Sequence, residues 1–295
     1  MKHAPTSPDE GPRIGLALAG GGVRGLAHVN ALDVLDSLDI RPVAIAGTSI
    51  GAIIGALYAS GKSAVEIREY VRQFVITKDD KLGDIYGKRE ELMRWLGALR
   101  PSFERGGLVA ADRLLEHLLG DLKETRFEDL AIPLRVVATD FHRGEQVVID
   151  SGELLPAIRA SMSIPGVFLP FVDDDRVLVD GGVVNNLPYD QLPGDIDLRI
   201  AIDIAPTRRS EGEEMPKFFD MSLGMFDIMQ EKMTAEKLRH DPPDVYACFR
   251  CSGVRMLDFG KIEDVWDQGG EEAGRLRCRL AEALCEGKGE AAARG

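Results

Sequence analysis

Two short apolar stretches, each ending in glycines, constrain the fold of this chain more than any other feature. Ile14–Ala19 runs into the glycines of Gly20–Gly25, and Pro42–Ala46 runs into Gly47–Gly51. After the first glycine turn, apolar residues recur at helical spacing over Leu26–Leu38. Strand, glycine turn and helix in repeated succession are typical of parallel strands covered on both faces by other elements. The pattern therefore predicts an α/β fold.

Later segments extend this pattern. Apolar runs predict strands at Leu134–Thr139, Gln146–Ile149, Val177–Val179, Leu198–Ile204 and Val245–Arg250. Helical spacing predicts helices around Ala64–Val75, Lys88–Leu99, Ala111–Leu119, 215–239 and 269–285. Asp173–Asp175 is expected to form a solvated hairpin tip.

No segment rich in proline, glycine and serine divides the middle of the chain, so we expect one α/β domain over residues 13–286. Residues 63–125 form a helical cap insertion in this prediction. Residues 1–12 and 287–295 have polar or low-complexity compositions and are expected to be flexible tails.

Charge and composition exclude several classes of partner. The 295 residues carry 36 Lys plus Arg against 49 Asp plus Glu, a formal net charge of −13. This balance disfavours nucleic acid, whose binding depends on cationic contacts to phosphate, and it disfavours charge attraction to anionic lipid. No stretch approaches 18 apolar residues, and the first residues do not resemble a secretory signal. We therefore expect a cytoplasmic protein that contacts a membrane surface, if at all, peripherally and transiently through a local apolar patch.

The cysteines do not predict a disulfide scaffold or a metal site. There are four in the chain, at positions 248, 251, 278 and 285. Cys248 and Cys251 have the C-x-x-C spacing of some zinc sites, but they fall on a predicted strand, where positions i and i+3 face opposite sides. Buried thiols are the favoured interpretation, and no metal is expected.

The first glycine turn, Gly20-Gly21-Gly22-Val23-Arg24-Gly25, precedes a helix. Free backbone N–H groups at a helix start can hold a phosphate or an oxyanion, although the turn could also serve packing alone. The G-x-G-x-x-G pattern matches a dinucleotide site, which requires an acidic residue at the end of the next strand. Ala46-Gly47-Thr48-Ser49 stands there instead, which disfavours nucleotide.

The second turn, Gly47-Thr48-Ser49-Ile50-Gly51, has the G-x-S-x-G pattern of a nucleophile elbow between strand and helix. Such a turn exposes a serine hydroxyl at the edge of the sheet. The alternative is that Ser49 only caps the helix.

A serine nucleophile needs a base. Of the five histidines, at positions 3, 28, 117, 142 and 240, only His240 fits the chain order of an α/β-hydrolase triad, and it lies near a predicted helix end. Asp180, followed by Gly181 and Gly182, ends a predicted strand and would lie at the same edge as the two glycine turns. We therefore favour Asp180 as the base; the alternative is an aspartate that only holds its own turn.

Together these turns resemble the three signature blocks of the patatin-like phospholipases, in the order Gly20–Gly25, Gly47–Gly51 and Asp180–Gly182. Further blocks similar to the bacterial branch of that family are Arg24–His28, Ala138–Asp140, Ala160–Phe168 and Asp180–Pro188. The resemblance covers roughly residues 13–205.

This resemblance implies a three-layer α/β/α sandwich around a mostly parallel sheet, and an enzyme that hydrolyses acyl esters of lipids without metal or cofactor. It implies Ser49 as nucleophile and Asp180 as base. It also implies an oxyanion hole made by the N–H groups around Gly21, Gly22 and Val23, with Arg24 helping to shape it.

Met221, Met225, Met229 and Met233 recur every four residues on the predicted helix 215–239. The favoured interpretation is a core-facing stripe; the alternative is a flexible wall for an acyl chain or a lipid-contacting surface. For the whole chain we expect a serine lipid acyl hydrolase. The competing hypothesis is a non-catalytic module that binds acyl lipids on the same fold. The sequence is silent on the oligomeric state.

Overall fold

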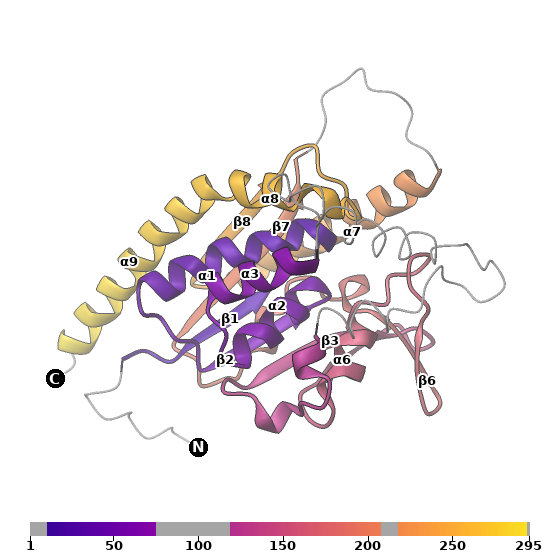
Figure 1. Cartoon of the computed structure of the whole chain (residues 1–295). Helices are drawn as coiled ribbons and strands as arrows, with labels where there is room; N and C mark the ends of the chain where they lie inside the picture. Colours follow the sequence, from indigo (N-terminus) through magenta and orange to yellow (C-terminus); the bar gives the residue numbers. More distant parts are fainter. Residues whose placement is uncertain (1–10, 75–118, 208–217, 294–295) are drawn as a thin grey trace.

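The computed structural model describes residues 11–74, 119–207 and 218–293 (Figure 1). Within them a mixed sheet of eight strands has the order β5-β6-β3-β2-β1-β7-β8, and β4 pairs with β3. The strands are β1 (Ile14–Leu18), β2 (Ala44–Thr48), β3 (Leu134–Asp140), β4 (Glu145–Ile149), β5 (Phe171–Asp173), β6 (Arg176–Asp180), β7 (Leu198–Pro206) and β8 (Val245–Cys251). β1, β2, β3, β7 and β8 are parallel, which confirms the predicted mostly parallel sheet.

The direction in which the chain crosses the sheet determines which face each helix covers. The helices are α1 (His28–Ser37), α2 (Ile50–Ala59), α3 (Ala64–Phe74), α6 (Leu154–Ser161), α7 (Phe218–His240), α8 (Ile262–Gln268) and α9 (Gly270–Ala293). The steps from β1 to β2 and from β2 to β3 go the same way, so right-handed crossovers put α1 and α2 on one face. The step from β7 to β8 goes the opposite way and puts α7 on the other face.

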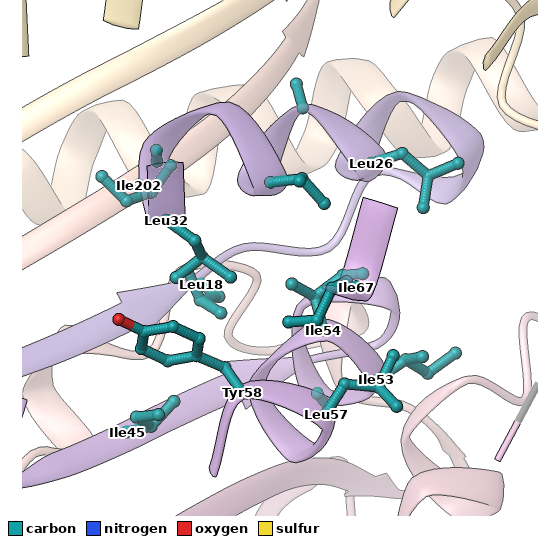
Figure 2. Packing of buried hydrophobic residues seen from close by; sticks show 14 of the residues in the cluster. Leu18, Leu26, Leu32, Ile45, Ile53, Ile54, Leu57, Tyr58, Ile67 and Ile202 are labelled. Atoms are coloured by element: carbon teal, nitrogen blue, oxygen red, sulfur yellow. The ribbon is translucent and has the colours of Figure 1, made fainter. Parts of the chain in front are cut away.

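The two faces of the sheet are packed differently. On one face Leu18 and Ile202 contact a large core formed with α1, α2, α3, α8 and α9, part of which is shown in Figure 2. On the other face small side chains alternate with these, namely Ala17, Ala19, Ala46 and Ala201. Because these side chains are short, the segment around Leu187 and Tyr189 can pack directly on the strands.

The candidate site lies along one edge of β3, at the point where β2 ends and β6 takes over the pairing. β4 occupies one edge of β3 along Val136–Asp140, so β6 must pair with the other edge, beyond the end of β2. Thr48 pairs with Val137 and Asp180 pairs with Ala138, the next residue. Since β6 is antiparallel to β3, the last residues of β2 and β6 meet end to end. The prediction placed Asp180 at this edge by assuming that its strand is parallel to the others. In the structure Asp180 lies at this edge, but on a strand that is antiparallel to β3.

Most predicted elements are present with small shifts. The strand predicted at Pro42–Ala46 is Ala44–Thr48, and the helix predicted at Leu26–Leu38 is a 3₁₀ turn, Gly22–Ala27, followed by α1. The predicted hairpin tip is confirmed, since Asp174 and Asp175 connect β5 to β6. Three short elements, β5, α6 and α8, were not predicted.

Other expectations concern the ends and the cap. α9 continues past residue 286, where the composition suggested a tail, and ends at Ala293. Of the proposed cap, α3 and residues 119–125 are described; the helices predicted at Lys88–Leu99 and over most of Ala111–Leu119 lie outside the described residues. In the ranges that the structure describes, no helix has the length and apolar character needed to cross a bilayer.

Candidate active site

Ser49 occupies a strained turn between β2 and α2. Its φ of 55° and ψ of −123° lie in a region that residues with a side chain rarely adopt. The backbone N–H of Ser49 donates to the Ser161 hydroxyl at 2.8 Å, and that hydroxyl donates to the carbonyl of Val137 at 2.6 Å. Such strain, of about 1–3 kcal/mol, persists where surrounding structure enforces it. The turn therefore has the geometry of the predicted nucleophile elbow.

Close packing on the adjacent β1 explains the glycine after this turn. A Cβ atom at Gly51 would lie 2.2 Å from the carbonyl oxygen of Leu18. The remaining residues of the motif have clear places: Gly47 and Thr48 end β2, Ile50 begins α2 against Gly25, and the Thr48 hydroxyl donates to the Asn185 carbonyl at 2.9 Å.

Asp180 is buried at the end of β6. Its carboxylate accepts a hydrogen bond from the backbone N–H of Gly182 at 2.7 Å, and the side chain of Ser49 lies close enough to favour the charged form. Burial raises the pKa of Asp180 from 3.8 to about 6, although both of these neighbours act in the opposite direction. Gly181 and Gly182 begin the 3₁₀ turn that follows. The predicted hydroxyl and carboxylate are therefore neighbours, with the carboxylate held in a desolvated position.

The first glycine turn lies against Ser49. A Cβ at Gly20 would be 3.3 Å from the Cβ of Ser49, and Gly22 has a φ of 59°, which favours glycine. The N–H of Val23 donates to the Met256 carbonyl at 2.8 Å. Among the described residues the N–H groups of Gly21 and Gly22 make no hydrogen bond. Of the three predicted oxyanion donors, Val23 is thus already occupied.

Arg24 links this turn to α7 through two hydrogen bonds. Its Nε donates to the Gly21 carbonyl at 3.3 Å, and its Nη2 donates to Asp227 of α7 at 2.5 Å. The Arg24 side chain is 3% exposed and that of Asp227 is 15% exposed. The guanidinium therefore ties the glycine turn to α7.

The histidines have other surroundings. His28 is fully buried, its Nε2 lies 2.8 Å from the Ala19 carbonyl, and burial lowers its pKa to about 4. His240 is exposed at the end of α7 and pairs with Glu236. His142 is exposed beyond β3, and positions 3 and 117 lie outside the described residues. No histidine among the described residues contacts Ser49.

Three residues of the site were not assigned a role from sequence. Ser161 holds the nucleophile turn, as described above. The side-chain oxygen of Asn186 is buried without a hydrogen-bond partner and lies beside Gly20 and Gly182. Gln230 is the α7 residue closest to Gly182, since its Nε2 would lie 2.1 Å from a Cβ there. Burial of polar side chains is the signal that identifies them, and it requires a structure.

The surroundings of the cysteine pair on β8, and the residue that ends β2, bear on the metal and nucleotide hypotheses. Cys248 is half-buried and Cys251 buried on β8, and burial raises the pKa values of their thiols to about 12 and about 11. No cluster of metal ligands occurs within the described residues. β2 ends at Thr48 without the acidic residue that a dinucleotide site requires.

These turns belong to a known family. The sequence profile of the patatin-like phospholipases matches residues 16–193, a span that contains all three turns. The chain belongs to the patatin-like phospholipase family, a class of lipid hydrolases.

Curated relatives agree with this assignment. An uncharacterised NTE family protein of Mycobacterium tuberculosis is 32% identical over 227 residues, covering 74% of this chain and 58% of that protein. A second NTE family protein of this species is 35% identical over 198 residues, which cover 67% of this chain and 31% of that protein. Lysophospholipase nte1 of Aspergillus fumigatus is 28% identical over 286 residues, covering 88% of this chain and 18% of that protein. The chain thus spans little more than half of the first relative and less of the others.

Solved structures that align with most of this chain include a human phospholipase A2 and a protein from Legionella pneumophila. The alignment with human GIVD cytosolic phospholipase A2 covers 95% of this chain and 61% of that protein's chain, at 12% identity and a TM-score of 0.48. The alignment with VipD from Legionella pneumophila covers 90% of this chain and 67% of that protein's chain, at 13% identity and a TM-score of 0.47. The family assignment rests on the sequence match.

Proposed function

We propose that this chain is a serine acyl hydrolase that cleaves fatty-acyl esters of phospholipids or related lipids, with Ser49 as nucleophile and Asp180 as base. The observation that carries the proposal is the buried placement of Ser49 beside the carboxylate of Asp180, where β2 and β6 meet end to end. A base with a pKa of about 6 is largely ionised at neutral pH and can still accept a proton. Family membership and the lysophospholipase relative support lipid as substrate.

The reaction follows the geometry of these groups. The Ser49 oxygen attacks the ester carbonyl carbon while its proton passes to Asp180. The N–H groups of Gly21 and Gly22, which are free of other partners in the described chain, hold the resulting oxyanion. Collapse of this intermediate breaks the ester bond, Asp180 returns the proton to the departing alcohol, and the acyl group remains on Ser49.

The second half reverses these roles. Asp180 removes a proton from water, and the resulting hydroxide attacks the acyl carbonyl. When the intermediate collapses, the fatty acid leaves and Ser49 regains its proton from Asp180. Because the carboxylate must be ionised in both halves, turnover should fall as the pH drops below about 6.

A fluorophosphonate probe tests this proposal, because it reacts covalently with activated serines. We expect labelling at Ser49 in the full chain, none in Ser49→Ala, and unchanged labelling in Ser60→Ala, which removes a serine at the opposite end of α2. The rate of ester cleavage by Ser49→Ala should be at least about 10³ lower.

Absence of labelling in folded wild-type protein would refute the hydrolase. The chain would then fit the competing hypothesis of a module that binds acyl lipids without cleaving them. Full activity of Asp180→Asn would instead remove Asp180 from the mechanism.

A further inference from the structure

The N-terminal half of α7 exposes a strip of large apolar side chains. Five of them, here called the apolar face of α7, are between 45% and 82% exposed: Phe218, Met221, Met225, Ile228 and Met229. At about 100° per residue they lie within an arc of about 100°. The side turned towards the protein carries Asp227, Gln230 and Thr234, together with Leu223 and Phe226, which pack against the core. The prediction of a core-facing methionine stripe is therefore wrong for the three exposed methionines, and only Met233 is half-buried.

The inner side of α7 includes polar residues that contact polar parts of the candidate site. Asp227 pairs with the buried guanidinium of Arg24, and Gln230 packs against Gly182. In this orientation Met221, Met225 and Met229 face solvent. In Figure 1 the N-terminal turns of α7, in orange, extend away from the sheet on the same side as the β5–β6 hairpin. The helix therefore borders the candidate site with its inner side and presents its apolar face outward.

The charges around the apolar face point to one kind of partner. Phe218–Met229 contains no lysine, arginine or histidine, and its two acids are paired, Asp220 with Arg255 and Asp227 with Arg24. The segment that carries the apolar face thus supplies no cation of its own to attract anionic lipid. The net charge of −13 repels both an anionic membrane and a second copy of the chain.

We propose that the apolar face of α7 inserts into the surface of a zwitterionic lipid bilayer or micelle and brings the candidate site to its substrate. This inference rests on the proposed function, because it takes the substrate to be a lipid held in such a surface. Methionine and phenylalanine suit this role, since flexible and large apolar side chains fill the irregular space among lipid chains. Binding then depends on buried apolar area and is insensitive to salt.

Vesicle sedimentation with the Ser49→Ala chain tests the docking without consuming lipid. We expect the protein to bind phosphatidylcholine vesicles equally at low and high salt, and less well when phosphatidylglycerol is added. Replacing Met225 and Met229 together by glutamine should lower the partition coefficient at least about tenfold. Replacing both by leucine should preserve binding.

Val65→Gln is the matched control, because Val65 is also an exposed apolar residue but lies at the start of α3, beyond the end of α2 remote from Ser49. It should bind like the parent protein. Circular dichroism and thermal unfolding confirm that each variant is folded.

Three results would overturn the docking: unchanged binding of the double glutamine variant, binding that needs phosphatidylglycerol and disappears in salt, or a change from dimer to monomer in light scattering on glutamine substitution. The last would make the apolar face a self-association surface. Fluorophosphonate labelling of wild type without vesicle binding refutes only the docking, whereas vesicle binding without labelling refutes only the hydrolase.

Discussion

α2 and α7 approach the same candidate site from opposite faces of the sheet, and their surroundings are opposite. In α2 every residue from Gly51 to Ala59 is buried, and the helix holds Ser49 at its N-terminus. In α7 only Gln230 and Thr234 are buried, although the helix has 23 residues. One half of the site is therefore built on the core, and the other half is a mostly exposed helix held by polar contacts and by the half-buried Leu223, Phe226 and Leu238.

This difference predicts how substitutions in α2 and in α7 should affect the protein. Substitutions in α2 act on packing and change the free energy of unfolding. Substitutions on the outer side of α7 change little in folding and act through what the helix contacts. The predictions below probe this contrast, beginning with the largest expected effect.

Gly51→Ala should prevent folding or destabilise the chain by at least about 4 kcal/mol. The new Cβ would lie 2.2 Å from the Leu18 carbonyl oxygen, and neither backbone can move without disturbing β1. Urea unfolding measures this effect. Gly224→Ala on α7, where a Cβ meets nothing within 4 Å, is the control and should be neutral or slightly stabilising. Equal stability of both variants would break the contrast between the helices.

Ile54→Ala should lower the free energy of unfolding by about 2–5 kcal/mol, because Ile54 of α2 is fully buried and lies beside Ile67 of α3 (Figure 2). The matched change on α7, Met225→Ala, should cost less than about 0.5 kcal/mol, since Met225 is 57% exposed. Chemical denaturation of both variants in parallel provides the comparison. A cost at Met225 similar to that at Ile54 would show that α7 is buried in solution.

Asp180→Asn should stabilise the chain above pH 6. Folding raises the pKa of Asp180 from 3.8 to about 6, so between these values the folded state retains a proton that the unfolded state has lost. The free energy of unfolding of the wild type therefore falls as the pH rises through this window, by about 3 kcal/mol from this group. The variant avoids this loss.

Thermal unfolding against pH measures the difference between the two proteins. The curves should coincide below pH 4 and separate above pH 6, with the variant more stable. A constant difference at all pH values would contradict the raised pKa.

Asp227→Asn should lower the free energy of unfolding by only about 1–2 kcal/mol, because asparagine can still accept a hydrogen bond from the buried Arg24. We expect kcat to fall about tenfold, since Arg24 also holds the Gly21 carbonyl beside the proposed oxyanion donors. Steady-state kinetics on a short soluble ester measure this. Asp220→Asn is the control, because its pair with Arg255 is exposed and should contribute little.

The strained turn at Ser49 was predictable from the sequence, because its constraints are local. The spacing of glycines around Ser49 identifies a strained turn from neighbouring residues alone. The end of β2 was predicted two residues too early, at Ala46 instead of Thr48, because Gly47 was taken as part of the turn. In the structure Gly47 is still paired within the sheet, to Leu18 and Val136.

Features that depend on distant residues could not be predicted. The antiparallel direction of β6 follows from which edge of β3 is free, and no local pattern encodes that. The occupied N–H of Val23 depends on the Met256 carbonyl, 233 residues further along the chain. For α7, periodicity correctly placed the methionines on one side, but hydrophobicity alone pointed that side inward. In the structure the inward side instead carries Asp227, paired with Arg24, and the core-packed Leu223 and Phe226.

The end-to-end meeting of β2 and β6 also has a consequence during synthesis of the chain. The serine and the aspartate are separated by 131 positions and lie on strands that share only the edge of β3. A nascent polypeptide that has emerged as far as α2 carries the alcohol without its proton acceptor. In this mechanism the growing protein stays inert towards esters until β6 has joined the sheet, so cleavage begins only once the scaffold around it is complete.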